Sequence, residues 1–209
     1  MKTRLPLLSS ALLLAMSSST FAASSVDLTV KGLITPSACS PSLSSGGIVD
    51  HGKVAAKDLK LDHWTLLGNH MLQLTINCEA ATLLALKGID NIGNAFDPRN
   101  SYGLDLVGGK KLGEYLLVLS NPSADDAAIS MIESANNGLT WQESFPGDVW
   151  PITSLASFGD RSSGRWAPTP VKQVTADLLV QTLIAPTANM DLTTEVAING
   201  SATLEVKYL

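Results

Sequence analysis

The stretch VTADLLVQTLIAP, residues 174–186, has the longest alternating pattern in the chain. Small or apolar side chains take every second position, and Pro186 ends the run. Because successive side chains of a β-strand point to opposite faces, this spacing predicts a long strand with one buried face. The residues expected on that face are Val174, Ala176, Leu178, Val180, Thr182 and Ile184.

Shorter runs of the same kind recur and predict further strands. They are LQLTINC, with Leu72, Leu74, Ile76 and Cys78 on one face; GLDLVG, with Leu104 and Leu106; EYLLVLS; AAISMIES; and SATLEVKYL, with Ala202, Leu204, Val206 and Tyr208. Breaks rich in Gly, Pro, Asn, Asp and Ser separate the runs. No long amphipathic helix is evident, so the pattern predicts an all-β protein, a β-sandwich.

Two local signals add detail to this expectation. Asn199-Gly200 stands between apolar residues, as in the tight turns of β-hairpins, and predicts a hairpin turn. The stretch VAAKDL, residues 54–59, is suited to a short helical turn.

The first 22 residues have the features of a secretory signal peptide. Lys2 and Arg4 precede a mostly apolar run from Leu5 to Met16, and small residues surround Ala22, the expected cleavage site. The alternative, a single membrane anchor, is disfavoured because the run is too short to span a bilayer. No second run of sufficient length follows. We therefore expect export and no integral membrane segment.

Composition narrows the function classes. Removing residues 1–22 leaves 187 of 209 residues, which suits one well-buried domain, and takes the net charge from −5 to about −7. No basic patch stands out, which argues against nucleic acid as a partner. The charged fraction of 16% is below the roughly 25% usual for globular domains.

The two cysteines, Cys39 and Cys78, predict a disulfide in an exported chain. Closing a loop of this length stabilises a fold by roughly 4 kcal/mol in the chain-entropy model. Two buried free thiols are the alternative. Two cysteines with three scattered histidines do not form a metal-site spacing, so we expect neither a metal nor a cofactor.

A strand is also predicted close to the start of the mature chain, in SVDLTVKGLITPSAC, residues 25–39. An exposed apolar strand beside a free terminus invites pairing with another strand edge. An ordinary first strand paired within its own domain is the alternative. The alternating positions are Val26, Leu28, Val30, Gly32 and Ile34.

Four segments, taken together with their order along the chain, resemble subunits of chaperone–usher, type 1-like fimbriae. LTVKGLITPSAC is similar to a pilin N-terminal extension, and LQLTINC to the strand that carries the second cysteine. IVDHGKV, residues 48–54, is similar to the segment between the cysteines, although His51 stands where an apolar residue is commoner. ATLEVKYL is similar to the C-terminal pilin strand, with Tyr208 as its penultimate residue. The middle of the chain, residues 86–169, matches the pilin pattern poorly.

The resemblance implies an immunoglobulin-like β-sandwich of pilin type that lacks its last strand. A periplasmic chaperone would fill the resulting groove, contacting the strand of Ala202, Leu204, Val206 and Tyr208. The extension of a neighbouring subunit would then replace the chaperone at an outer-membrane usher, a form of β-strand addition. Gly32 would lie where the groove is too shallow for a side chain.

These implications give a domain plan and a function as expectations. Residues 1–22 are the signal peptide, 23–36 the donor-strand extension and 37–209 the pilin-like domain. The chain would pass through the periplasm and become a structural subunit of a surface fimbria, polymerising with its neighbours and contributing to adhesion. Because each extension would serve the next subunit, the contact is head-to-tail and builds a filament.

Signals of catalysis are weak. SANNGLTW, residues 134–141, resembles the Asp-box of sialidases and other β-proteins, with Asn136 in place of the aspartate. The motif describes a hairpin in which Asn136 bonds the turn and Trp141 packs underneath. No nucleophile motif or pair of carboxylates at fixed spacing occurs, so we do not expect an enzyme.

A non-polymerising exported binding protein is the alternative function. Trp141, Trp150 and Trp166 stand in or near polar loops, where aromatic faces could bind glycans. Burial under the loops is the ordinary expectation for tryptophan.

Overall fold

The structure is a computed structural model that describes residue 29 and residues 38–209. The predicted signal peptide and, apart from Thr29, the predicted donor strand from Val26 to Ile34 lie outside the described residues. Residues 38–209 all belong to one compact unit of the chain.

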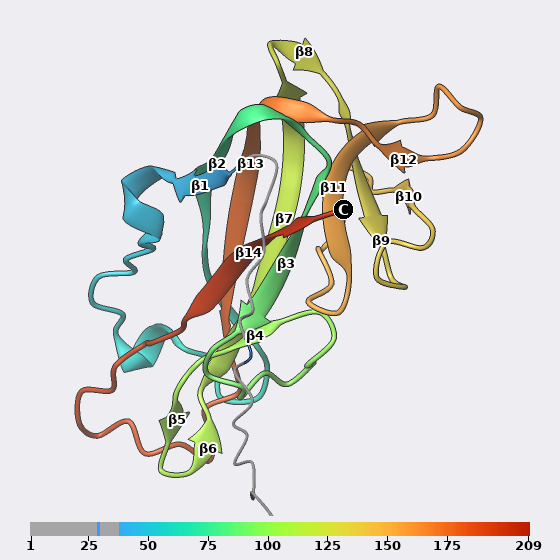
Figure 1. The fold of residues 1–209 in the computed structure, drawn as a ribbon. Coiled ribbons are helices and arrows are strands. Elements are labelled where there is room, and N and C mark those ends of the chain that lie inside the picture. Colours follow the sequence, from blue (N-terminus) through green and yellow to red (C-terminus); the bar gives the residue numbers. More distant parts are fainter. Residues whose placement is uncertain (1–28, 30–37) are drawn as a thin grey trace, which may run out of the picture. The chain divides into compact units, whose positions relative to one another are not determined.

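The first sheet is antiparallel and has the order β1-β2-β13-β7-β4, with β8 paired to β7. Figure 1 shows its three long strands side by side. Its strands are β1 (Cys39–Leu43), β2 (Thr65–Thr82), β4 (Tyr102–Gly103), β7 (Gly113–Ala124), β8 (Ala127–Ala128) and β13 (Val171–Ile184).

The second sheet is also antiparallel and has the order β10-β9-β11-β3-β14, with β12 paired to β11. Its strands are β3 (Leu84–Asp90), β9 (Ser130–Ser134), β10 (Gln142–Glu143), β11 (Leu155–Asp160), β12 (Ala167–Pro168) and β14 (Ala202–Tyr208). A separate hairpin joins β5 (Leu106–Val107) and β6 (Lys110–Lys111), and two short 3-10 helices, η1 (Ser44–Gly47) and η2 (Ala56–Asp58), follow β1.

The core lies between the inner faces of the two sheets. Alternation along β2 and β13 places every predicted inward residue of both strands in it, from Leu72 to Cys78 and from Val174 to Ile184. The second sheet contributes large side chains such as Leu86 and Phe158. The predicted all-β sandwich is therefore confirmed, because period-two burial of long apolar strands leaves only a two-layer solution.

Two local expectations were wrong. Asn199-Gly200 is not a hairpin turn: Gly200 pairs with Leu104 in an isolated antiparallel bridge, and no strand precedes it in residues 185–199. Leu106 does not share the buried face of Leu104 but is exposed, because the chain leaves the sheet to form the β5–β6 hairpin. The predicted helical turn at residues 54–59 is confirmed as η2.

The predicted disulfide is confirmed between Cys39 and Cys78, which face each other across β1 and β2. It fixes the first described strand to the edge of the first sheet. None of the helices within the described part of the chain has the length and hydropathy to cross a membrane.

Candidate functional site

The outer edge of β14 is the most unusual feature of the sandwich. β14 ends the order of the second sheet and pairs only with β3 among the strands of residues 38–209. Its full length of seven residues is paired on that one side. An unpaired edge of this length is a template for another strand.

The phase of the β3–β14 ladder determines what this edge offers. The Asn91 N–H donates to the Ser201 carbonyl at 3.0 Å, and the Leu209 N–H donates to the Leu83 carbonyl at 3.1 Å. In an antiparallel ladder these bonds recur at every second residue, so the odd-numbered residues of β14 face β3. The N–H and C=O groups of the even-numbered residues therefore point to the open edge; these residues are Ala202, Leu204, Val206 and Tyr208.

β1, the edge strand of the first sheet, is a poorer template for an added strand than β14. The Glu79 N–H donates to the Ala38 carbonyl at 3.1 Å, so the even-numbered residues of β1 face β2 and the odd-numbered ones face outward. Of the outward groups, the Cys39 N–H already donates to the Tyr208 hydroxyl at 2.9 Å, and Pro41 has no N–H. Hydrogen bonds to an added strand would come mainly from β14.

An apolar groove with a volume of about 260 Å³ lies beside β14. One bank is the segment of Leu43, Val49 and His51, and the other is the β14 segment with Ala202 and Leu204. The floor is the core itself, formed by Leu72, Leu117, Leu178 and Val180 of the first sheet. Ala202, Leu204 and Val206 pack against the core, and Ala202 and Leu204 also line the groove, so the open backbone edge borders the apolar depression over this part of β14.

The two ends of the groove differ. Beyond the end nearest Tyr208, the Cys39 N–H donates to the Tyr208 hydroxyl and so links β1 to β14. At the end near Gly200, the backbone passes close to the core: a Cβ at Gly200 would lie 2.7 Å from Tyr115 Cε1. Glycine is therefore required at residue 200 by close approach, and not by a turn. We call these the Tyr208 end and the Gly200 end.

A pair of histidines stands at the bank opposite β14. The rings of His51 and His70 meet edge to face with centroids 4.7 Å apart. Burial lowers the pKa of His51, the nearby His70 lowers it further, and Asp50 opposes the effect. His51 is thus held toward its neutral form beside the groove, which suits an apolar occupant.

Beneath the Gly200 end, Tyr102 and Tyr115 stack with centroids 5.2 Å apart. Burial raises the pKa of both phenols well above the ordinary value, with the charge of Asp90 as a smaller cause. The Tyr102 hydroxyl is fully buried and has no hydrogen-bond partner among the described residues. This pair is a rigid support for the groove floor rather than a reactive group.

The Asp-box-like stretch is a structural hairpin, as its residues predict. Asn136 Oδ1 accepts from the Thr140 N–H at 2.9 Å, and the Ser134 hydroxyl accepts from the Gly138 N–H at 2.8 Å. Gly138 has a φ of +88°. Trp141 Cζ2 lies 3.6 Å from the position of a Cβ on Gly138, so the ring packs against the turn.

The three tryptophans of the alternative glycan site differ in exposure. Trp150 is only 3% exposed, and its Nε1–H donates to the Ser154 carbonyl, so its ring offers no face to a sugar. Trp141 and Trp166 are half-buried. Trp166 lines a cavity that Asp160 and Arg161 also reach.

Within residues 38–209, no three His, Cys, Asp or Glu side chains gather in a way that would hold a metal ion. The predicted chaperone-binding residues all belong to the open edge of β14. The bank residues Leu43, at the end of β1, and Val49 and His51, in the irregular segment after η1, were not predicted as site residues, because periodicity along the chain does not show which distant strand lies beside them.

Comparison with known proteins places this chain beside two proteins of Escherichia coli K12. It is 26% identical to Protein GltF, over 97% of this chain and 98% of the relative. It is 26% identical to the uncharacterized protein YhcF, over 90% of this chain and 92% of the relative. The chain is a distant relative of both. Residues 28–107 also match the profile of a family described as "Protein of unknown function (DUF1120)".

The matched residues 28–107 include β1, the disulfide and the long strand β2. The two relatives match almost the entire length of the chain. Neither their names nor the family description states an activity.

Proposed function

We propose that this protein is a fimbrial subunit that polymerises by donor-strand exchange, with its groove filled first by a periplasmic chaperone. The observation that carries the proposal is the coincidence of an open β14 edge with an apolar groove whose floor is the core. In this proposal the groove is the place of one missing strand. β-Strand addition would supply main-chain bonds to β14 and alternating side chains to the groove.

The proposed occupant is the segment Val26–Ile34 of a neighbouring copy. Its apolar residues Leu28, Val30 and Ile34 have the period of two that the even-numbered residues of β14 require. The polar residues Asp27, Thr29 and Lys31 would then point to solvent. One alternating segment thereby satisfies both the hydrogen bonds and the apolar floor.

The chain would be exported, held in the periplasm by its chaperone, and assembled at an outer-membrane usher into a surface fimbria that contributes to adhesion. The proposal assigns no catalytic step and needs no cofactor. Its energetic basis is removal of the groove lining from water together with completion of the β14 ladder.

An SDS gel of material sheared from producing cells, loaded with and without boiling, tests this function. We expect a ladder in the unheated sample that collapses to monomer on boiling. Deleting residues 26–34 should abolish the ladder. Replacing Leu28 and Val30 by Ser should also abolish it, because their side chains would enter the groove.

The matched control replaces Asp27, Thr29 and Lys31 by Ser and should keep the ladder. If only monomer appears in every lane of the unmodified chain, and that monomer is folded, the proposal is wrong. Residues 26–34 would then belong to their own domain.

A further inference from the structure

The proposed exchange favours one direction for the incoming strand, and this inference rests on that proposed function. β14 is the better template of the two groove edges, and antiparallel pairing is the more stable arrangement per residue. An antiparallel strand running past β14 has its C-terminal residue, Ile34, at the Gly200 end.

Chain length then limits where the incoming domain can lie. Five residue steps separate Ile34 from Cys39, and an extended chain spans at most about 3.3–3.6 Å per residue, or roughly 17 Å in total. Cys39 lies at the Tyr208 end of its own domain, because its N–H donates to the Tyr208 hydroxyl. The Tyr208 end of the incoming copy must therefore lie against the Gly200 end of the accepting copy.

The Gly200 end has an exposed aromatic and apolar surface, which we call the accepting patch: Trp64, Phe96 and Leu106. Trp64 and Phe96 meet edge to face with ring centroids 4.8 Å apart. Lys111 Nζ lies 5.3 Å from the Phe96 ring centroid, and Lys111 pairs with Leu106 across the β5–β6 hairpin. The exposed fractions are 38% for Trp64, 43% for Phe96 and 48% for Leu106.

Backbone contacts connect the accepting patch to the groove. Leu104 bridges Gly200, and the Asp105 N–H donates to the Asn199 carbonyl at 2.9 Å. Leu106 follows directly in sequence. The patch is thus continuous with the end of the groove where the incoming strand would emerge.

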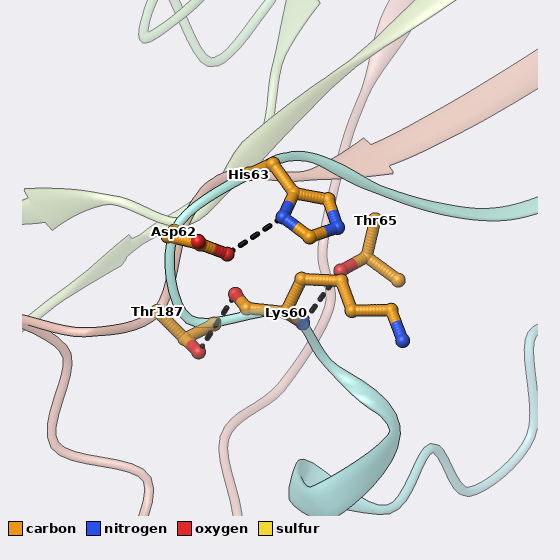
Figure 2. A network of polar contacts seen from close by, with 5 residues as sticks. All are labelled: Lys60, Asp62, His63, Thr65 and Thr187. Carbon is orange, nitrogen blue, oxygen red and sulfur yellow. Dashed lines mark hydrogen bonds and ion pairs between the residues drawn. The ribbon is translucent and has the colours of Figure 1, made fainter.

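The loop that carries Trp64 is pre-organised. Thr65 Oγ1 accepts from the Lys60 N–H at 2.9 Å, and Thr187 Oγ1 donates to the Lys60 carbonyl at 3.1 Å. Figure 2 shows these contacts on the two sides of Lys60. His63 Nδ1 lies 2.6 Å from Asp62 Oδ1 in the same loop. Because the backbone of the loop is already held in place, a partner would bind it without a large ordering cost.

The Tyr208 end has its own exposed apolar surface, the incoming patch: Leu83, Leu139 and Leu209. Leu83 and Leu209 face each other across β3 and β14, and Leu209 Cδ2 lies 3.8 Å from the position of a Cβ on Gly138. Leu139 is 83% exposed at the tip of the Asn136 hairpin. The hydrogen bonds within that hairpin hold Leu139 out in solvent, a position that its own domain does not explain.

We propose that the accepting patch of one copy binds the incoming patch of the next, forming a second, head-to-tail contact beside the inserted strand. Both surfaces are apolar, lie at opposite ends of the groove and are brought together by the short connection from Ile34 to Cys39. Contiguous exposed apolar side chains of this kind mark protein contact sites. A contact between unlike surfaces leaves a free surface at each end and extends a filament without closing it.

Cross-linking of assembled material tests the contact. Leu106→Cys and Leu139→Cys are made singly and together, the polymers are treated with a short thiol cross-linker, and gels are run unheated and boiled. The unheated ladder reports strand exchange, whereas boiled species report covalent links between patches. We expect boiled dimers and higher species for the double variant and none for either single variant.

Met71→Cys combined with Leu106→Cys is the matched control, because Met71 is exposed on β2 away from both patches, and it should give no boiled species. An unheated ladder without boiled species in the Leu106/Leu139 double variant would overturn this contact and leave strand exchange intact. Boiled dimers from a single variant would also overturn it, since they require like surfaces to meet. Absence of any unheated ladder in the unmodified chain would refute both proposals.

Discussion

At the scale of single residues, two glycines allow close approach of the second sheet and the segment before β14 to the stacked tyrosine rings, and of these only Gly200 and Tyr115 line the groove. A Cβ on Gly88 would lie 1.9 Å from the Tyr102 hydroxyl oxygen, and a Cβ on Gly200 would lie 2.7 Å from Tyr115 Cε1. Neither residue has a positive φ, so space and not backbone conformation selects glycine. The sequence shows the two glycines, but it does not predict that the rings of Tyr102 and Tyr115 pack against them.

The Gly88–Tyr102 contact predicts a non-additive pair of substitutions. Tyr102→Phe should leave stability unchanged or raise it by about 1 kcal/mol, because it removes a buried hydroxyl that has no partner. Gly88→Ala should cost about 1–3 kcal/mol through overpacking. The cost should be smaller in the Tyr102→Phe background, where the nearest atom is gone.

Urea unfolding of the four proteins of this cycle measures the coupling. Thr194→Ala, an exposed change in the loop before β14, serves as the control and should be neutral. Equal costs of Gly88→Ala in both backgrounds would show that the hydroxyl does not limit the space at residue 88.

At the scale of elements, the backbone groups of β14 alternate between the side that bonds β3 and the open edge. Odd-numbered residues hold the strand to β3, and even-numbered residues offer their backbone groups to the open edge. A proline removes one N–H and is tolerated in strands chiefly where that N–H points away from the sheet. Proline at an odd-numbered residue and proline at an even-numbered residue of β14 should therefore have different effects.

Val206→Pro should give a folded monomer that no longer forms the unheated ladder, because the lost N–H faces the groove. Glu205→Pro should instead destabilise the monomer by about 3 kcal/mol or more, because the lost N–H faces β3. Urea unfolding of the purified monomer and the unheated gel distinguish the two effects. Equal destabilisation by both prolines would contradict the assigned phase of the ladder.

At the scale of the whole domain, the Cys39–Cys78 bond holds one bank of the groove to the first sheet. It joins β1 to β2 across a sequence separation of 39 residues. All five residues of β1 pair with β2, and the disulfide adds a covalent link at the Cys39 end of this ladder. Through the Cys39 N–H it also holds the Tyr208 end of the groove together.

Replacing both cysteines by serine should lower the free energy of unfolding by about 4 kcal/mol, the chain-entropy value for a loop of this length. Guanidinium unfolding of the double variant against the oxidised chain measures the loss. Reduction of the unmodified chain is the control and should give a similar loss. A loss near zero in both would mean that the loop is already constrained in the unfolded chain.

Alternation and cysteine content were enough to predict the β-sandwich, the buried faces of β2 and β13, and the disulfide. Burial follows directly from a period of two when a strand is long and one face is apolar. The same local reasoning failed at Asn199-Gly200 and at Leu106, where contacts with Leu104, Tyr115 and the β5–β6 hairpin override the turn and strand signals.

The sequence by itself determined that the chain forms strands with alternating apolar residues, because alternation depends on neighbours along the chain. It also determined the disulfide, because an exported chain with two cysteines has one pairing to make. Only the tertiary structure decided that β14 has an open edge, that the edge borders an apolar groove, and that Leu43, Val49 and His51 form the opposite bank. Those features depend on which strands are adjacent in space, and strand order is set by packing of the whole sandwich rather than by any one segment.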